Sequence, residues 1–299
     1  MSTRVAAVRA LSPPRETLAR ALLAPAAPLM LWQGRRVRRL ALRLPEAAGA
    51  RAGEADGDGA GRRLLIVGDS SAAGVGVTEQ SQALSGQLIR ALAARGVMPS
   101  RWQLIARTGV SAAALPGLID QGLDEAHAPS EAFDVALVVV GVNDVTGATP
   151  IARWLADLDR LHARLKRLGV HAAVFSGLPP MERFFALPQP LRLWLGLQAR
   201  RYDRALGQWS AARPDTFHRV LPPLHDRALL ASDGFHPGEA GCAFWAGELV
   251  QTLAPLLAAD QGGATSTGIA RFKPASSIAT QASVASGTRA EHERVFRGE

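Results

Sequence analysis

Residues 133–144 of the chain read FDVALVVVGVND. All six residues from Val135 to Val140 are apolar, and four of them are valine. An uninterrupted apolar run of this kind is typical of a strand buried on both faces of a sheet. Glycine, asparagine and aspartate follow within four residues, so polar groups stand where this strand ends. The stretch therefore predicts a parallel sheet covered by helices, with polar groups at its carboxyl edge.

The same alternation of apolar runs and helical spacing extends in both directions from this stretch. The expected strands are Leu64–Gly68, Trp102–Ala106, Phe133–Val140, Val170–Phe175 and Phe217–Leu221. The expected helices are Gln80–Arg95, Leu115–Glu125, Ile151–Leu168, Leu191–Ala212 and Gly238–Ala258. Five strands separated by helices predict an α/β domain over residues 64–259, which is long enough for one core.

Charge is distributed unevenly along the 299 residues. The net charge is +8, of which residues 1–63 carry +7, residues 64–259 carry none and residues 260–299 carry +1. We expect a basic N-terminal arm over residues 1–63, in which residues 46–61 form a flexible linker because they are mostly Ala, Gly and acidic residues. The tail over residues 260–299 is rich in small and polar residues, and we expect it to be disordered.

Composition excludes several classes of protein. A single cysteine, Cys242, excludes an intramolecular disulfide framework and a cysteine-rich metal site. No run of about 18 residues is apolar enough to predict a membrane span. We expect no metal and no other cofactor, since no His, Asp or Glu set has convincing ligand spacing. We also expect no nucleic-acid partner, because the central block is neutral and carries no known binding motif.

The basic arm allows two interpretations. Residues 34–44 can form a helix with Val37, Leu40, Ala41 and Leu44 on one face and arginines on the other, after an apolar segment that contains Trp32. Such a helix favours peripheral contact of residues 20–44 with an anionic membrane surface. It equally favours packing on the domain with the arginines in solvent. The expected location is cytoplasmic, with the inner face of the membrane as the open alternative.

The ends of the expected strands carry residues suited to acyl transfer. Ser70 follows the first strand and could act as a nucleophile activated by the imidazole of His236. Asp233, three residues before His236, could hold the imidazole in the required tautomer. The backbone N–H groups of Ser70 and Gly109 and the side-chain amide of Asn143 could donate to an oxyanion.

Four segments together resemble the sequence blocks of the SGNH (GDSL-type) hydrolase superfamily: residues 68–70, Gly109, residues 141–144 and residues 233–237. The resemblance covers about residues 64–259. It implies a flavodoxin-like three-layer α/β/α sandwich with a parallel five-stranded sheet, and an esterase that works through a serine, a histidine and an aspartate. The residues carried over are Ser70, Gly109, Asn143, His236 and Asp233.

The chain departs from the family pattern next to two of these residues. Ser71 stands where the commonest motif has leucine, and Arg107 and Thr108 precede Gly109 where an asparagine is often found. The second departure puts in question how the loop at Gly109 is held, although it does not affect the backbone donor. Asp69 and Asp144 are expected to brace loops rather than to take part in chemistry.

The substrate is expected to be a small-molecule or lipid ester. The apolar segment 179–197 could overhang the site, and its substrate-binding candidates are Phe184, Phe185 and Trp194, with helix packing as the alternative. This favours aliphatic or lipid-like acyl esters. Two alternatives stay open: an O-deacetylase of a carbohydrate or small molecule, and a catalytically silent protein that binds lipid or is tethered to a membrane.

Overall fold

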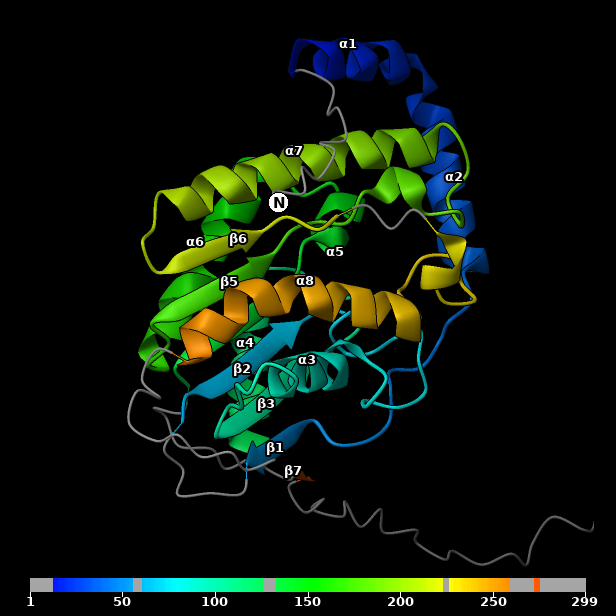
Figure 1. Ribbon diagram of the computed structural model, residues 1–299. Helices are drawn as coiled ribbons and strands as arrows, with labels where there is room; N and C mark the ends of the chain where they lie inside the picture. Colours follow the sequence, from blue (N-terminus) through cyan, green and yellow to red (C-terminus); the bar gives the residue numbers. More distant parts are fainter. Residues whose placement is uncertain (1–12, 56–60, 126–132, 223–225, 259–271, 275–299) are drawn as a thin grey trace, which may run out of the picture.

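A computed structural model describes residues 13–55, 61–125, 133–222, 226–258 and 272–274 (Figure 1). The strands are β1 (Ala52–Ala55), β2 (Arg63–Gly68), β3 (Arg101–Ala106), β4 (Val135–Val139), β5 (Ala172–Ser176), β6 (Thr216–Arg219) and β7 (Phe272–Pro274). The α-helices are α1 (Pro13–Leu23), α2 (Ala27–Leu40), α3 (Leu84–Ala93), α4 (Leu115–Glu125), α5 (Val142–Thr146), α6 (Ile151–Arg167), α7 (Leu191–Ala211) and α8 (Glu239–Ala258). Three short 3-10 helices are η1 (Ala24–Ala26), η2 (Met181–Arg183) and η3 (Arg227–Leu229).

The central sheet has the strand order β6-β5-β4-β2-β3-β1-β7. The five strands from β2 to β6 pair in parallel, as the sequence predicts. Counted along the chain, these five lie in the order 2-1-3-4-5, which is the flavodoxin-like order. The order reverses between β2 and β4, and ligands of such sheets bind beyond the carboxyl ends of the strands at such a point.

The expectation of only five strands is wrong at one edge of the sheet. β1 pairs antiparallel with β3, and β7 pairs antiparallel with β1. Both strands come from segments read as linker and tail. Their residues lack an apolar alternation, and an edge strand can be held by backbone hydrogen bonds alone, so composition does not reveal them. The rest of the tail lies outside the described residues.

Helices cover both faces of the sheet and produce two apolar cores. In β2, Leu64 and Ile66 face the core beneath α3 and α8, whereas Leu65 and Val67 face the core beneath α4, α6 and α7 (Figure 1). All four side chains are completely buried. Successive strand residues point to opposite faces, so burial of both faces explains the unbroken apolar runs in the sequence. The three-layer α/β/α fold is therefore confirmed.

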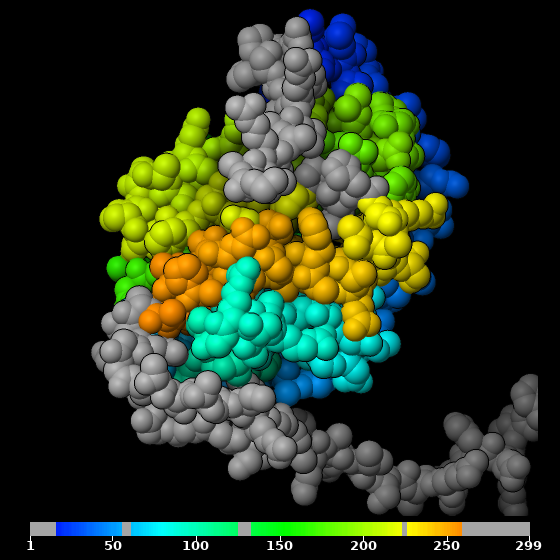
Figure 2. Space-filling view, in the orientation of Figure 1, coloured from blue at the N-terminus to red at the C-terminus, as the bar shows by residue number. Residues whose placement is uncertain are grey.

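The N-terminal helices pack on the domain. Met30 of α2 is buried in the core beneath α7, and the buried carboxylate of Glu16 in α1 forms an ion pair with Arg204 of α7. In Figure 2 the blue atoms of these helices lie directly beside the green atoms of the segment that leads into α7. The expected helix over residues 34–44 begins earlier and ends at Leu40. Contact of residues 20–44 with a membrane stays a prediction.

None of the helices in the described part of the chain combines the length and the apolar character needed to cross a membrane.

Candidate active site

Ser70, His236 and Asp233 form one chain of hydrogen bonds. Ser70 Oγ lies 2.9 Å from His236 Nε2, and His236 Nδ1 lies 2.6 Å from Asp233 Oδ2. With its proton on Nδ1, the imidazole donates to Asp233 and accepts from the Ser70 hydroxyl. Ser70 follows β2, whereas the other two residues come from the loop before α8, about 165 residues later in the chain. The structure thus brings together three residues that the sequence suggested as a unit.

The loop that carries Asp233 and His236 is folded by the aspartate itself. Asp233 Oδ1 accepts hydrogen bonds from the backbone N–H groups of Phe235 and His236, at 2.9 and 3.0 Å. Gly234 has a φ of +65°, which favours glycine in this tight turn. The turn directs the imidazole of His236 back to the carboxylate of Asp233. Residues 233–236 by themselves therefore fix the orientation of the ring.

These contacts keep the Asp233 carboxyl ionised. Burial by itself raises its pKa, but the hydrogen bonds from the His236 side chain and from the two N–H groups outweigh burial and hold the pKa below its usual value. The side chain of Asp233 is 7% exposed and that of His236 is 16% exposed. An ionised carboxylate in this position stabilises a proton on the imidazole, so the histidine can accept one from Ser70.

The three N–H groups named as candidate oxyanion donors belong to Ser70, Gly109 and Asn143. No described residue accepts a hydrogen bond from the backbone N–H of Ser70 or of Gly109. Asn143, at the start of α5, uses one N–H of its amide to donate to the carbonyl of Val110, at 2.9 Å, and its amide carries a second. That bond ties the loop after β4 to the loop after β3. The three donors therefore come from the ends of β2, β3 and β4, at the point where strand order reverses.

The backbone conformation at position 109 favours glycine. A Cβ built on Gly109 meets no described atom within 4 Å, so the protein itself does not crowd the position. Its φ of +81° is instead the feature that favours glycine.

The loop at Gly109 is braced by residues that sequence reasoning missed. Glu46 Oε1 accepts from the backbone N–H and the hydroxyl of Thr108, at 2.7 and 2.8 Å. Arg51 donates to Glu46 Oε2 at 2.6 Å and to the carbonyl of Ala106 at 2.8 Å. Both residues lie in the stretch read as a linker, and no local pattern marks them. The loop in which Arg107 and Thr108 precede Gly109 is thus held by a contact between distant segments.

Asp69 and Asp144 brace loops, as expected. Asp69 Oδ1 accepts from the N–H of Ser71 at 3.0 Å, and Asp144 Oδ2 accepts from the N–H of Ala112 at 3.1 Å. Burial raises the pKa of each carboxyl to about 6, against the partial compensation of these hydrogen bonds. The two carboxyls hold the loops that carry Ser70 and Gly109.

The three substrate-binding candidates lie in different surroundings. Phe184 is buried, with its ring centroid 4.6 Å from that of Phe235, which is 5.2 Å from the ring of His236. Phe185 is 45% exposed and lines a groove of about 890 Å³ that also contains His236. Trp194 lines neither this groove nor the small apolar pocket beside Phe184. The structure therefore brings two of the three aromatic rings to the site.

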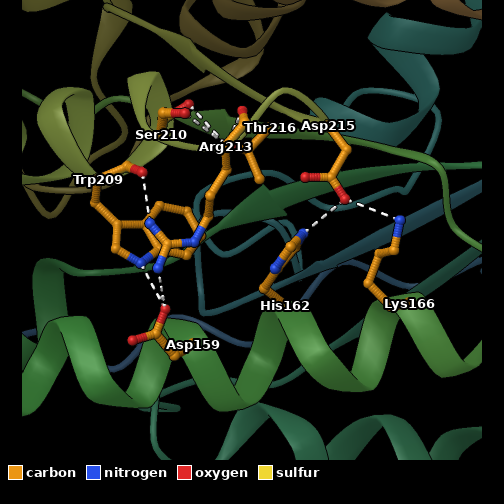
Figure 3. A network of polar contacts seen from close by, with 8 residues as sticks. All are labelled: Asp159, His162, Lys166, Trp209, Ser210, Arg213, Asp215 and Thr216. Carbon is orange, nitrogen blue, oxygen red and sulfur yellow. Dashed lines mark hydrogen bonds and ion pairs between the residues drawn. The ribbon is translucent and has the colours of Figure 1, made fainter.

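Other titratable groups lie elsewhere. His162 of α6 pairs with Asp215, the residue before β6, within the network of Figure 3. His218 pairs with Asp203. Cys242 is buried in α8, and burial raises the pKa of its thiol to about 12. Among the described residues, no group of three or more His, Cys, Asp and Glu side chains is arranged to hold a metal ion.

Comparisons with known proteins agree with this architecture. The chain resembles the crystal structure of TesA, with 22% identity and a TM-score of 0.50 over 66% of this chain and 100% of that one. It resembles the lipase Lip_vut3 from a goat rumen metagenome, with 14% identity and a TM-score of 0.50 over 64% and 96% of the two chains. For a family 3 carbohydrate esterase of Clostridium thermocellum, identity is 16% and the TM-score 0.49 over 65% and 96%. At these identities the likeness to the first two structures concerns the fold alone.

A comparison with curated proteins gave no match. Residues 66–244 match the GDSL-like Lipase/Acylhydrolase family, and these residues include the serine, the histidine and the aspartate described above. Because the match spans more than half of the chain, the chain belongs to the GDSL-like lipase/acylhydrolase family, the SGNH hydrolases.

Proposed function

We propose that the protein hydrolyses carboxylic esters with Ser70 as the nucleophile, and that its substrates carry aliphatic or lipid-like acyl groups. The observation that carries the first part is the continuous hydrogen-bonded path from Ser70 Oγ through His236 to Asp233. A serine hydroxyl becomes an effective nucleophile only when a base removes its proton, and here the base is already in contact with it.

The reaction begins as Ser70 Oγ attacks the ester carbonyl carbon and His236 Nε2 takes the hydroxyl proton. The carbonyl oxygen becomes an oxyanion, which the N–H groups of Ser70, Gly109 and Asn143 stabilise. The C–O bond to the alcohol then breaks, and the imidazolium returns its proton to the leaving oxygen. Asp233 stays ionised throughout and stabilises the imidazolium.

The second half of the reaction regenerates the serine. A water molecule loses a proton to His236 Nε2 and attacks the acyl carbon. The bond between that carbon and Ser70 Oγ then breaks, Ser70 recovers its proton from the imidazolium, and the carboxylic acid leaves.

Support for an aliphatic substrate comes from the apolar surroundings of the site. The tilted rings of Phe184 and Phe235 pack together, and Phe235 packs edge-on against His236. The adjoining groove is lined by Phe185, Leu187 and Leu191. Buried apolar surface favours an acyl chain by about 0.8 kcal/mol for each methylene group removed from water.

Hydrolysis of p-nitrophenyl esters from acetate to decanoate tests both the role of Ser70 as nucleophile and the preference for aliphatic acyl groups. We expect Ser70→Ala to lower kcat at least about 1000-fold. Ser81→Ala, which alters an exposed serine, is the matched control and should leave kcat unchanged. Retained activity in Ser70→Ala would refute the nucleophile. We expect kcat/KM to rise with chain length, whereas a strict preference for acetate would favour the O-deacetylase alternative.

A further inference from the structure

Helix α2 lies outside the residues that match the family, yet it forms one side of the groove at the active site. The groove of about 890 Å³ is bounded by α2, by residues 185–188 with Leu191 and Leu195, and by Asn143, Asp233 and His236. Figure 1 shows α2 beside the edge at which the parallel strands end. A substrate held by the donors around Ser70 would therefore extend along this helix.

Three contacts fix α2 in that position. Gln33 donates from Nε2 to the carbonyl of Gln189 at 2.7 Å, and its Oε1 accepts from the N–H of Leu191 at 3.2 Å. Leu191 is the first residue of α7, so the glutamine satisfies a donor that the helix start leaves free. Arg38 donates to the carbonyl of Thr146, at the end of α5, at 2.9 Å. The helix is thus bound to both elements that face it across the groove.

The side of α2 that lines the groove carries large apolar side chains. Trp32 is 53% exposed, Leu40 is 67% exposed and Val37 is half-buried, and all three line the groove. Across the groove lie Phe185 and Leu187. Large apolar side chains on both walls would release water if an aliphatic chain lay between them.

Cationic groups stand on the same wall. Arg36 and Arg38 line the groove, and the Arg36 guanidinium lies 5.7 Å from the ring centroid of Trp32. Among the described residues that line the groove, Asp233 is the only acidic one, and its carboxylate is engaged by His236. The net charge of the groove wall therefore favours a ligand that carries a negative charge as well as an aliphatic chain.

We propose that α2 is a substrate-binding element, and that the groove takes an ester with a long aliphatic chain and a negatively charged group. This inference rests on the proposed esterase activity, since the groove is assigned to the substrate of Ser70. It adds a wall supplied by the N-terminal arm and a preference for anionic amphiphilic esters.

A substitution that narrows the groove tests whether the groove binds the aliphatic chain of the ester. Ala41 lines the groove at the end of α2, and Ala41→Trp would fill space next to Leu40. We expect KM for p-nitrophenyl nonanoate to rise about tenfold, the effect of excluding about two methylene groups, with acetate changed less than about twofold. Arg39→Trp places the same bulk on an exposed position that does not line the groove, and it should leave both esters unchanged.

The anionic part is tested with the mono-p-nitrophenyl ester of nonanedioic acid, which adds a carboxylate to the same chain length. We expect the wild type to favour this ester over nonanoate, and Arg36→Gln to reduce that preference about two- to fivefold. Arg39→Gln, which removes an equal charge from the same helix outside the groove, should keep the preference.

The outcomes separate this inference from the proposed function. Loss of all activity in Ser70→Ala, together with equal effects of Ala41→Trp on short and long esters, would overturn the role of α2 and leave the esterase standing. An Arg36→Gln variant that binds anionic vesicles less well but keeps its preference between the two monomeric esters would also overturn it, since the arm would then serve a lipid surface.

Discussion

The imidazole of His236 makes one hydrogen bond through each ring nitrogen, to Asp233 on one side and to Ser70 on the other. Asp233 in turn accepts two backbone N–H groups, so it is oriented before it orients the ring. A carboxylate with three hydrogen bonds is stabilised in its charged form, and this makes it a fixed negative charge beside the imidazole. The polar groups around His236 are therefore oriented before a substrate binds, and such preorganisation is a major source of the rate enhancement of enzymes.

Asp233→Asn tests the role of that carboxylate. The amide keeps the size of the side chain but removes the charge and can present a donor to His236 Nδ1, which disfavours the tautomer that accepts the Ser70 proton. We expect kcat to fall about 10³- to 10⁴-fold with little change in KM. Steady-state kinetics on p-nitrophenyl butyrate measures both.

The matched control is Asp215→Asn. Asp215 also pairs with a histidine, His162 Nε2 at 3.0 Å, but it lies in a network that ties α6 to the segment before β6 and includes Lys166 (Figure 3). This substitution should leave kcat within about twofold. Equal losses in the two variants would mean that Asp233 acts through stability alone.

For single residues, the sequence predicts a role where the partners of the residue lie close to it along the chain. Asp233, Gly234 and His236 lie within four positions, and their spacing alone suggests a turn that returns the imidazole to the carboxylate. Glu46 could not be found in this way, because its partner Thr108 is 62 residues away and neither residue belongs to a recognisable pattern. Contacts between distant polar side chains depend on the finished fold.

Among the elements, the N-terminal helix α2 is the one for which the sequence left two interpretations open, membrane contact and packing on the domain. In the structure Met30 and Gln33 are buried against the domain. The strands and helices of the central block begin and end within a few residues of the predicted positions, because burial of both sheet faces leaves a strong apolar pattern. β1 leaves no such pattern, since it has four residues and three of them are alanine or glycine.

Gln33→Leu tests whether α2 is an integral part of the fold. Leucine preserves the buried volume but leaves the carbonyl of Gln189 and the N–H of Leu191 without their partner. We expect a loss of about 1–3 kcal/mol in the free energy of unfolding. That corresponds to a fall in Tm of about 2–12 °C in thermal unfolding followed by circular dichroism.

Gln198→Leu provides the comparison for this variant. Gln198 lies on α7 and pairs with Arg201 near the surface, so its loss should shift Tm by less than about 2 °C. Similar Tm values for both variants and the wild type would show that α2 contributes little to stability.

Two buried carboxyls, those of Asp69 and Asp144, hold the loops that carry Ser70 and Gly109, and burial disfavours the charged form of each. Asp144 is 1% exposed, and none of the described residues donates a hydrogen bond to its Oδ1. Burial raises its pKa from 3.8 to about 6. The folded state therefore binds this proton more tightly than the unfolded state, so the contribution of Asp144 to stability is greatest below pH 3.8 and is lost as the pH rises through 6.

Asp144→Asn is expected to remove that pH dependence. The asparagine can still accept from the N–H of Ala112, and it carries no charge to desolvate. We expect the stability of the variant relative to the wild type to increase by an amount on the order of 3 kcal/mol between pH 4 and pH 7. Urea unfolding of both proteins at pH 4, 5, 6 and 7 measures this difference, and a difference that is constant with pH would contradict it.

The net charge of the chain is concentrated in one segment. The net charge of +8 suggests a basic protein, but the block over residues 64–259 is neutral and the excess lies in the N-terminal arm. The structure places part of that arm, with Arg36 and Arg38, along the groove beside His236. The overall charge could be read from the sequence, whereas its position at the site depends on how α2 packs.

The central claim is that Ser70 is the nucleophile, and the most direct measurement is the site at which a fluorophosphonate probe attaches to the protein. Mass spectrometry of the labelled and digested wild type should locate a single phosphonyl group on Ser70 Oγ. Ser70→Ala should not be labelled, and His236→Ala should be labelled far more slowly because its serine lacks a base. A label on another residue, or an active esterase that takes no label, would contradict the account.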